Sequence, residues 1–149
     1  MSSMSENLCP LLTVVIPTCH RNRDLAECLT RLAPGKQTLD AAYYAVVVTD
    51  DGSKSTAEAM MKADFPWAHW TQGPRRGPAA NRNHGGAQSK TEWIVFSDDD
   101  CLPQPGLLQA YAEAFAAHPA VNVFEGRTSA DGKQFHPLAS APVNEDGGC

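Results

Sequence analysis

Short apolar runs alternate along the chain with stretches in which apolar residues recur at helical spacing. Apolar runs bounded by polar residues predict buried strands, and helical spacing predicts amphipathic helices. The predicted strands lie at residues 11–16, 43–48, 67–71, 93–96 and 121–124, and the predicted helices at 23–32, 55–63, 79–89 and 105–117. Strands that alternate with helices form a largely parallel sheet with right-handed crossovers. The pattern therefore predicts a three-layer α/β/α fold, with helices over both faces of a mostly parallel sheet.

Local signals predict where these elements begin, end and face. We expect Pro17 to end the first strand. Ser53 follows a turn-forming glycine and is expected to cap the second helix, on which Ala59 and Met60 should face inward. After Glu125 the apolar periodicity fades, and the remaining residues are rich in Gly, Pro, Ser, Asp and Asn. We therefore expect one folded unit followed by a loop-rich segment.

Polar residues follow three of the predicted strands at the point where each strand ends. They occupy residues 17–21, 50–53 and 97–100. The carboxyl ends of parallel strands lie at one edge of a sheet, and open α/β sheets bind their ligands at this edge. The sequence therefore predicts that the three clusters converge on one site.

The run Asp98-Asp99-Asp100 is the most acidic of these clusters and follows the strand at 93–96 directly. Neighbouring carboxylates repel one another, and each raises the pKa of the next. A divalent cation relieves this repulsion, and hard oxygen ligands favour Mg²⁺ or Mn²⁺. The triplet indicates either a metal site that receives a diphosphate or a solvated acidic turn that caps the next helix. On these residues alone, both interpretations stay open.

Composition narrows the possible functions. The 149 residues suffice for one domain, and a net charge of −5 argues against a broad nucleic-acid-binding face. No apolar stretch approaches the roughly 18 residues that span a membrane, and the polar N-terminus does not resemble a secretory signal. Five cysteines without a Cys-x-x-Cys pair indicate reduced thiols and argue against zinc. We expect a cytoplasmic protein without a transmembrane segment and without a nucleic-acid partner; the cytoplasmic face of a membrane stays open as its location.

The order of these segments resembles the family 2 glycosyltransferases of the GT-A fold. Four segments carry the resemblance: Val14 to Arg21, Asp50 to Ser53, Ala80 to Gly85, and Phe96 to Asp100. Each motif is weak alone, but the four occur in the family's order, over about residues 11–126. One local departure is Cys19-His20, where the family often has Tyr-Asn. The resemblance implies a Rossmann-like GT-A fold.

The resemblance implies a donor nucleotide site at the ends of the first two strands. By position, Pro17, Thr18 and Arg21 match the residues beside the nucleotide. Asp51 matches the carboxylate that hydrogen-bonds the base or the ribose. Its neighbour Asp50 is expected only to support that turn.

The resemblance also implies a metal site at the acidic run. Asp98 and Asp100 match the two ends of the family's Asp-x-Asp motif and would hold Mn²⁺ or Mg²⁺, with Asp100 the better direct ligand. Asp99 would then lie next to the ribose. Arg82 and Asn83 match the family's Arg-Asn pair below the donor, and Arg82 is expected to contact the nucleotide.

The implied activity is metal-dependent hexosyl transfer, with inversion, from a UDP-, GDP- or dTDP-sugar to an acceptor hydroxyl. The acceptor would be a saccharide, a lipid-linked molecule or a protein. In this scheme residues 1–10 form a disordered tail, 11–126 the GT-A nucleotide-sugar-binding domain, and 127–149 the loop-rich start of the acceptor half. The family's general base lies in the second half of the fold. We therefore expect a truncated chain that lacks the base, and Glu145 and Asp146 are poor candidates for it.

Other hypotheses differ from this one in class. The alternative is a truncated, catalytically silent module that binds a nucleotide sugar. A phosphohydrolase with an Asp nucleophile is disfavoured, because that class places its Asp-x-Asp motif after the first strand, whereas residues 98–100 follow the fourth. A phosphate-loop nucleotide triphosphatase is disfavoured because residues 52–56 lack the required Gly-Lys pair.

Overall fold

The computed structural model of the chain describes residues 10–130. The expectations for residues 1–9 and 131–149, including those for Glu145 and Asp146, lie outside the described residues. The chain divides into two compact units, one up to Gln109 and one from Ala110. The boundary falls within helix α4 (Leu107–Ala117).

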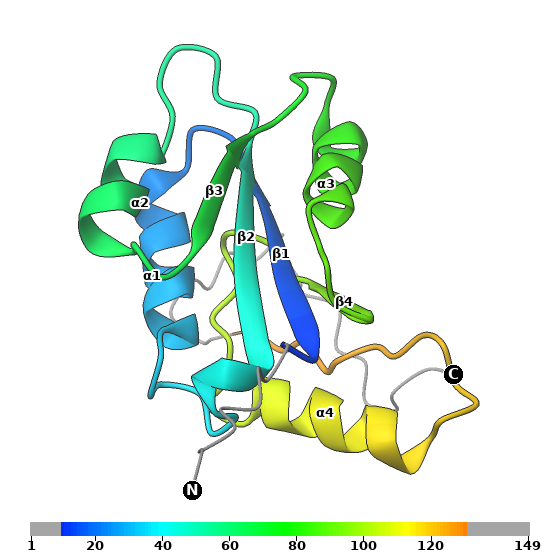
Figure 1. The fold of residues 1–149 in the computed structure, drawn as a ribbon. Helices are drawn as coiled ribbons and strands as arrows, with labels where there is room; N and C mark the ends of the chain where they lie inside the picture. The colour runs from blue at the N-terminus through cyan, green and yellow to red at the C-terminus, as the bar shows by residue number, and fades with distance from the viewer. Residues whose placement is uncertain (1–9, 131–149) are drawn as a thin grey trace, which may run out of the picture. The chain divides into compact units, whose positions relative to one another are not determined.

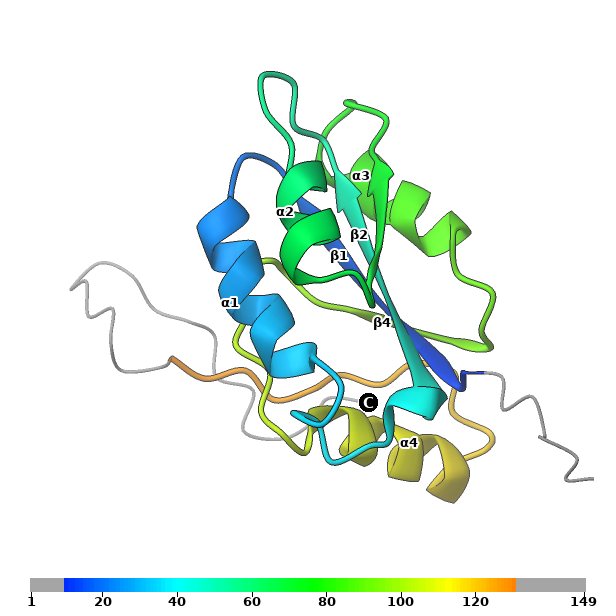
Figure 2. The same cartoon turned by 60° about the vertical axis from the view of Figure 1, so that its left-hand side comes forward.

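The first unit is built on a parallel four-stranded sheet. Its strands are β1 (Leu12–Thr18), β2 (Tyr44–Asp50), β3 (His69–Gln72) and β4 (Trp93–Phe96), in the order β3-β2-β1-β4. The other elements are α1 (Asn22–Leu32), a short 3-10 helix, η1 (Ala41–Tyr43), α2 (Glu58–Asp64) and α3 (Pro78–Ala87). Figures 1 and 2 show α1 and α2 on one side of the sheet and α3 on the other. The predicted fold class, a three-layer α/β/α fold with a parallel sheet, is confirmed.

The core forms where the two central strands meet the buried face of α1. β1 and β2 have nearly every side chain buried, as continuous apolar runs predict for a parallel sheet covered on both faces. On α1 the buried side chains are Leu25, Cys28, Leu29 and Leu32, which recur at helical spacing. Each fully buried leucine contributes about 1.5–3 kcal/mol relative to an exposed one. This core holds the carboxyl ends of β1 and β2 in place.

β1 continues through Pro17 to Thr18, so the prediction that Pro17 ends the strand is wrong. Alternate residues of a parallel strand direct their backbone groups to opposite neighbours. The Val15 carbonyl accepts from Ser97 N at 3.1 Å, which places the backbone groups of Val15, and of Pro17 two residues later, on the β4 side. β4 pairs with β1 only from Leu12 to Val15. The N–H that proline lacks therefore costs the sheet no hydrogen bond.

The start of α2 also differs from the prediction. The helix begins at Glu58 rather than at residue 55, and no side chain caps it in the expected way. Instead, the buried carboxylate of Asp50 accepts the N–H of Ala57 at 2.7 Å. The prediction that Ser53 caps this helix is therefore wrong, because a carboxylate from the preceding strand end already binds the first free N–H.

The later start changes which residues of α2 face inward. Ala57 and Met61, four positions apart, are buried. Ala59 is exposed and Met60 is half-buried, so the expected inward pair is wrong. Residues four apart share a helix face. The inward face therefore depends on where the helix begins, and the hydrogen bond from Ala57 N to Asp50 fixes that start.

β4 lies at an edge of the sheet and is only partly buried. Within residues 10–130 it pairs with β1 alone. Val95 is 6% exposed, whereas Ile94 and Phe96 are 38% and 49% exposed. The prediction of a strand at 93–96 is confirmed, but full burial is found only for Val95.

The fifth predicted strand, Val121 to Phe124, is wrong, because these residues form no strand in the structure. In the second unit the chain turns after α4, where Val121 N donates to the His118 carbonyl at 3.0 Å. Phe124 then packs against Phe115, with ring centroids 5.5 Å apart. Val123 is 81% exposed. This apolar segment pairs with no strand among the described residues and instead packs through the ring of Phe124.

None of the helices within residues 10–130 is long and apolar enough to cross a membrane.

Two adjacent glycines of α3 give a matched test of how closely this helix packs on the sheet. A Cβ at Gly85 would lie 2.6 Å from Val15 Cγ1 and 2.7 Å from Thr49 Cγ2, both on stiff β-branched side chains. At Gly86 the nearest atom, Phe96 Cζ, would be 3.5 Å away. We expect Gly85→Ala to lower the free energy of unfolding by about 2 kcal/mol. Gly86→Ala should raise it by about 0.5–1 kcal/mol through helix propensity.

Urea unfolding followed by circular dichroism measures both values. If Gly85→Ala proved as stable as Gly86→Ala, α3 would not pack against β1 and β2 as closely as the structure shows.

Candidate functional site

The three polar clusters meet at the carboxyl edge of the sheet, as predicted. Thr18, the last residue of β1, connects them. Its carbonyl accepts from Asp51 N at 3.0 Å, which joins the ends of β1 and β2. Its hydroxyl donates to Asp99 Oδ2 at 2.8 Å, which joins β1 to the acidic run after β4. One buried threonine therefore holds both acidic segments against β1.

Asp99 is the buried member of the acidic run. Its side chain is 7% exposed, and its other oxygen accepts from Arg21 Nη1 at 3.4 Å. Burial raises the pKa of this carboxyl group, and the Thr18 hydroxyl and the Arg21 guanidinium oppose that rise. Asp99 thus already binds two protein partners. The ribose contact that the resemblance assigns to it stays a prediction.

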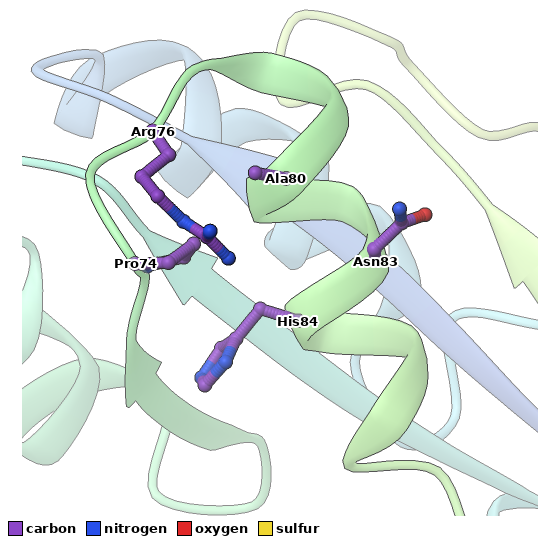
Figure 3. Close-up of a pocket in the computed structure, with 5 residues that line it drawn as sticks. All are labelled: Pro74, Arg76, Ala80, Asn83 and His84. Carbon is purple, nitrogen blue, oxygen red and sulfur yellow. The ribbon is translucent and has the colours of Figure 1, made fainter.

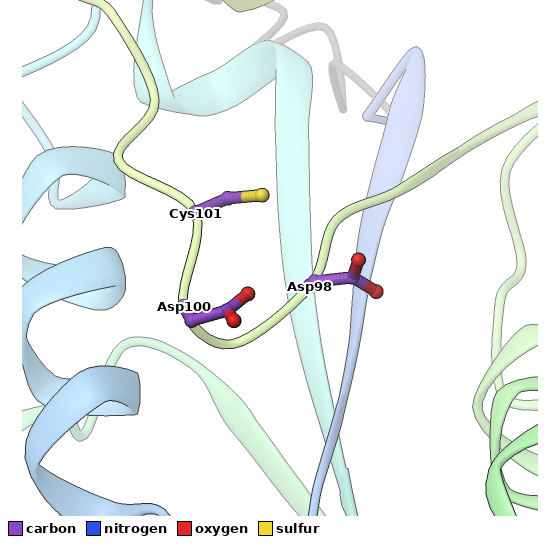
Figure 4. A group of neighbouring side chains, drawn as sticks. All are labelled: Asp98, Asp100 and Cys101. Atoms are coloured by element: carbon purple, nitrogen blue, oxygen red, sulfur yellow. The ribbon is translucent and has the colours of Figure 1, made fainter. Parts of the chain in front are cut away.

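Asp98 and Asp100 are the exposed members and lie on the turn after β4 (Figure 4). Arg82 Nη2 donates to Asp98 Oδ1 at 2.8 Å, and Arg21 Nη1 donates to Asp100 Oδ2 at 3.3 Å. One oxygen of each carboxylate and the Cys101 sulfur all lie within 4.8 Å of one another. Two convergent carboxylates are the hard donors that Mg²⁺ and Mn²⁺ take, so this donor set fits such an ion.

Two thiols lie near the acidic run and are poor nucleophiles. Burial raises the pKa of Cys28 to about 12, and its sulfur donates to the Asp98 carbonyl at 3.8 Å. Burial also raises the pKa of Cys101, which neighbouring carboxylates raise further. The thiolate is the reactive form. We therefore assign neither thiol a nucleophilic role.

The turn after β2 is organised by one buried carboxylate. Asp50, 1% exposed, accepts hydrogen bonds from Gly52 N at 2.8 Å, from Ala57 N at 2.7 Å and from Trp70 Nε1 at 3.2 Å. Its role is to support the turn, as expected. Asp51, the next residue, is half-buried and accepts from Arg75 N at 2.8 Å.

Two residues of the site were missed by sequence reasoning. His20 lies in the left-handed region, with φ of 56°, and its Nε2 accepts from Ser53 N at 3.3 Å. It therefore ties the loop after β1 to the loop after β2. Asn81 is a buried amide on the sheet-facing side of α3. Asn81 lies within the segment Ala80 to Gly85, but nothing in the sequence indicated that its amide is buried against the sheet. Nothing in the sequence indicated the left-handed conformation of His20 either.

An open hollow of about 500 Å³ lies beside α3 (Figure 3). Its lining residues are Pro74, Arg76, Ala80, Asn83 and His84. None of the residues predicted to bind the donor lines it. Arg82, next to Asn83 in sequence, instead reaches Asp98. The Arg-Asn pair of the motif is therefore divided between the acidic run and the hollow.

The first unit is thus an α/β domain with a parallel sheet, and its carboxylates and arginines lie at the carboxyl edge of that sheet. Domains of this class bind their ligands at that edge. The family model described as glycosyl transferase family 2 matches residues 13–140. The chain therefore belongs to glycosyl transferase family 2.

Individual relatives agree with this assignment. The chain is 25% identical over 135 residues to a Haemophilus influenzae protein named an uncharacterized glycosyltransferase, across 91% of the chain and 41% of that protein. Its fold matches Staphylococcus aureus TarS 1–349, with a TM-score of 0.68 and 22% identity, over 84% of the chain and 38% of TarS. TarS has also been solved with UDP and with UDP-GlcNAc.

A third match is the mannosyltransferase PcManGT of Pyrobaculum calidifontis, solved in complex with GDP-Man and Mn²⁺. The TM-score is 0.61 and the identity 25%, over 72% of the chain and 33% of that protein. The chain thus spans less than half the length of each of these three relatives.

Proposed function

We propose that this chain forms the donor-binding part of a metal-dependent, inverting glycosyltransferase, which transfers a sugar from a nucleotide-diphosphate-sugar to an acceptor hydroxyl. The observation that carries the proposal is the junction at Thr18, which brings Asp51 and the acidic run to one edge of the sheet. The complexes of TarS with UDP and of PcManGT with GDP-Man support a nucleotide-sugar donor.

Asp98 and Asp100 would hold the divalent ion, Mn²⁺ or Mg²⁺. Such an ion neutralises the diphosphate charge that grows as the glycosidic bond breaks. Arg21 and Arg82 lie against the same two carboxylates, at 3.3 Å and 2.8 Å. Their guanidinium groups would add positive charge beside the leaving diphosphate, at the place where negative charge develops.

Asp51 would bind the base or the ribose at the other end of the donor. Pro17 and Thr18 would lie beside the nucleotide, and Asp99 next to the ribose. The donor would be a UDP-, GDP- or dTDP-sugar. In the transition state the sugar becomes oxocarbenium-like, and an acceptor hydroxyl attacks as a carboxylate base takes its proton. We assign no residue of 10–130 as this base. A saccharide, a lipid-linked molecule or a protein would supply the hydroxyl.

The test is calorimetric titration of the chain with UDP, GDP and dTDP, each with and without Mn²⁺. We expect one of the three to bind, and to bind far more weakly without the metal. Asp51→Ala should weaken this binding by roughly 10-fold to 100-fold, the usual loss for a hydrogen bond to a charged group. Asp64→Asn, which removes an exposed carboxylate from the end of α2, is the matched control and should bind like the wild type.

If none of the three nucleotides bound in the presence of Mn²⁺, the proposal would be wrong. The second candidate function is a nucleotide-sugar-binding module without catalysis, which the 38–41% coverage of TarS and the Haemophilus protein keeps open. Both functions predict the same binding. Release of nucleoside diphosphate from a bound nucleotide sugar on addition of an acceptor would distinguish the enzyme.

A further inference from the structure

The side chain of Asn81, on α3, forms hydrogen bonds with both central strands at the carboxyl edge of the sheet. Its side chain is buried, at 2% exposure. Its amide nitrogen donates to the carbonyl of Thr49 at 3.0 Å and to the carbonyl of Thr18 at 3.3 Å. Its amide oxygen accepts from Thr49 Oγ1 at 2.7 Å. One side chain thus joins α3 to both central strands where they end.

Asn81 also contacts the segment that orients Asp51. A Cβ at Gly73 would collide with both the Asn81 amide oxygen and the Asp51 carboxylate, so these two side chains lie against the same side of Gly73. Gly73 N donates to the Asp50 carbonyl at 2.8 Å, which holds this segment against the end of β2. Asn81 and Asp51 therefore share Gly73 as a neighbour at the end of β2.

The same residue is connected to the metal end of the site through two routes. Thr18, whose carbonyl Asn81 binds, donates its hydroxyl to Asp99. Arg82, the next residue on α3, donates to Asp98 at 2.8 Å. Asn81 is therefore linked both to the Asp51 end and to the acidic end of the site.

We infer that Asn81 is a positioning residue, which sets the spacing between the Asp51 end and the acidic end of the donor site. The inference rests on the proposed function, because that spacing matters only for a ligand that reaches both ends, a nucleoside diphosphate with its metal. Asn81 is too deeply buried to touch such a ligand. It acts by holding the two strand ends and α3 in one arrangement.

The experiment compares ligands that use one end of the site with a ligand that uses both. Binding is measured for Mn²⁺ alone, for the free nucleoside alone by NMR titration, and for the nucleoside diphosphate with Mn²⁺ by calorimetry. The nucleoside is uridine, guanosine or thymidine, matched to the diphosphate that the wild type binds. Loss of a residue that sets the spacing should lower the affinity for the nucleoside diphosphate with Mn²⁺ only, whereas a general loss of structure should lower the affinity for all three ligands.

The variants are Asn81→Asp and Asn81→Ala. Asn81→Asp has the same shape but turns a carboxylate oxygen toward two carbonyls, and Asn81→Ala removes all three hydrogen bonds and is the variant to use if the first does not fold. We expect the affinity for the nucleoside diphosphate with Mn²⁺ to fall at least about tenfold, as for supporting residues around other sites. The affinities for Mn²⁺ alone and for the nucleoside alone should change much less, because each of these ligands uses only one end of the site.

Thr13→Val is the matched control. Thr13 is buried at 2% exposure in the same strand as Thr18, but at its opposite end, where its hydroxyl bonds Thr91 Oγ1 at 2.8 Å. This variant also loses side-chain hydrogen bonds, those with Thr91 and Ser89, and urea unfolding gives the stability cost of each variant. Its affinity for all three ligands should equal that of the wild type.

Several outcomes would overturn the inference. Unchanged binding of the combined ligand by Asn81→Ala would show that the spacing does not depend on Asn81. An equal loss for Mn²⁺ alone, or an equal loss in Thr13→Val, would show a general structural effect. Failure of the wild type to bind any nucleoside diphosphate would instead overturn the proposed function itself, so the two failures are distinguishable.

Discussion

Replacing Asp100 with asparagine is expected to abolish the Mn²⁺-dependent part of nucleotide binding, with a loss of affinity of about 100-fold or more. Asp100 is exposed, and its carboxylate converges with that of Asp98 within 4.8 Å. The amide keeps the shape of the side chain but removes the negative charge that the ion needs. Calorimetry of the nucleoside diphosphate with and without Mn²⁺ measures the effect.

Two comparisons make this result specific. Asp64→Asn removes the same charge from an exposed position in α2 and should change nothing. Without metal, Asp100→Asn should bind the nucleotide at least as well as the wild type, because one negative charge beside the diphosphate is gone. A variant that still showed the wild-type response to Mn²⁺ would remove Asp100 from the metal site.

Replacing Asp50 with alanine is expected to cost about 4 kcal/mol of the free energy of unfolding, the largest stability effect that we expect from a single polar residue. The change leaves three N–H groups without their acceptor: those of Gly52, Ala57 and the Trp70 indole. Each buried donor left unsatisfied costs about 1–3 kcal/mol. Since the free energy of unfolding of a domain is only about 5–15 kcal/mol, this variant would lose a large part of its stability.

Asp40→Ala is the matched control for this measurement. Asp40 is exposed and accepts a single backbone N–H, that of Ala42, at 2.8 Å. Its loss should cost about 0.5–1 kcal/mol, the usual value for a cap. Urea unfolding of both variants gives the comparison. A cost for Asp50→Ala no larger than that for Asp40→Ala would mean that water replaces the carboxylate and that the turn does not depend on it.

Much of the fold could be predicted from local pattern. The strands β1 and β2 were found because a strand buried on both faces must be apolar along its whole length, and this leaves a visible run. β3 and β4 lie at the edges of the sheet and are only partly buried, and their pattern in the sequence is shorter. The errors lie at the ends of elements. Pro17 does not end β1 because no partner strand needs its N–H there. The strand expected at Val121 is absent because the chain there turns back onto α4 within the second unit.

The candidate site was predictable in outline but not in the roles of its members. Three adjacent aspartates look alike in the sequence. In the structure Asp99 is buried and accepts a hydrogen bond from a threonine 81 positions away, while Asp98 and Asp100 are exposed and pair with arginines. His20 and Asn81 were missed because their roles depend on a left-handed backbone and on two strand ends that come together only in the folded chain.

The sequence by itself determined that acidic and polar residues follow three of the strands. It also predicted that these residues share one edge, because apolar runs that alternate with helical periodicity form a parallel sheet, whose strand ends lie together. Only the tertiary structure decided which carboxylates are exposed and which are buried. That choice depends on hydrogen bonds between segments far apart in the chain, such as those of Thr18 with Asp99 and with Asn81, and these have no local signature.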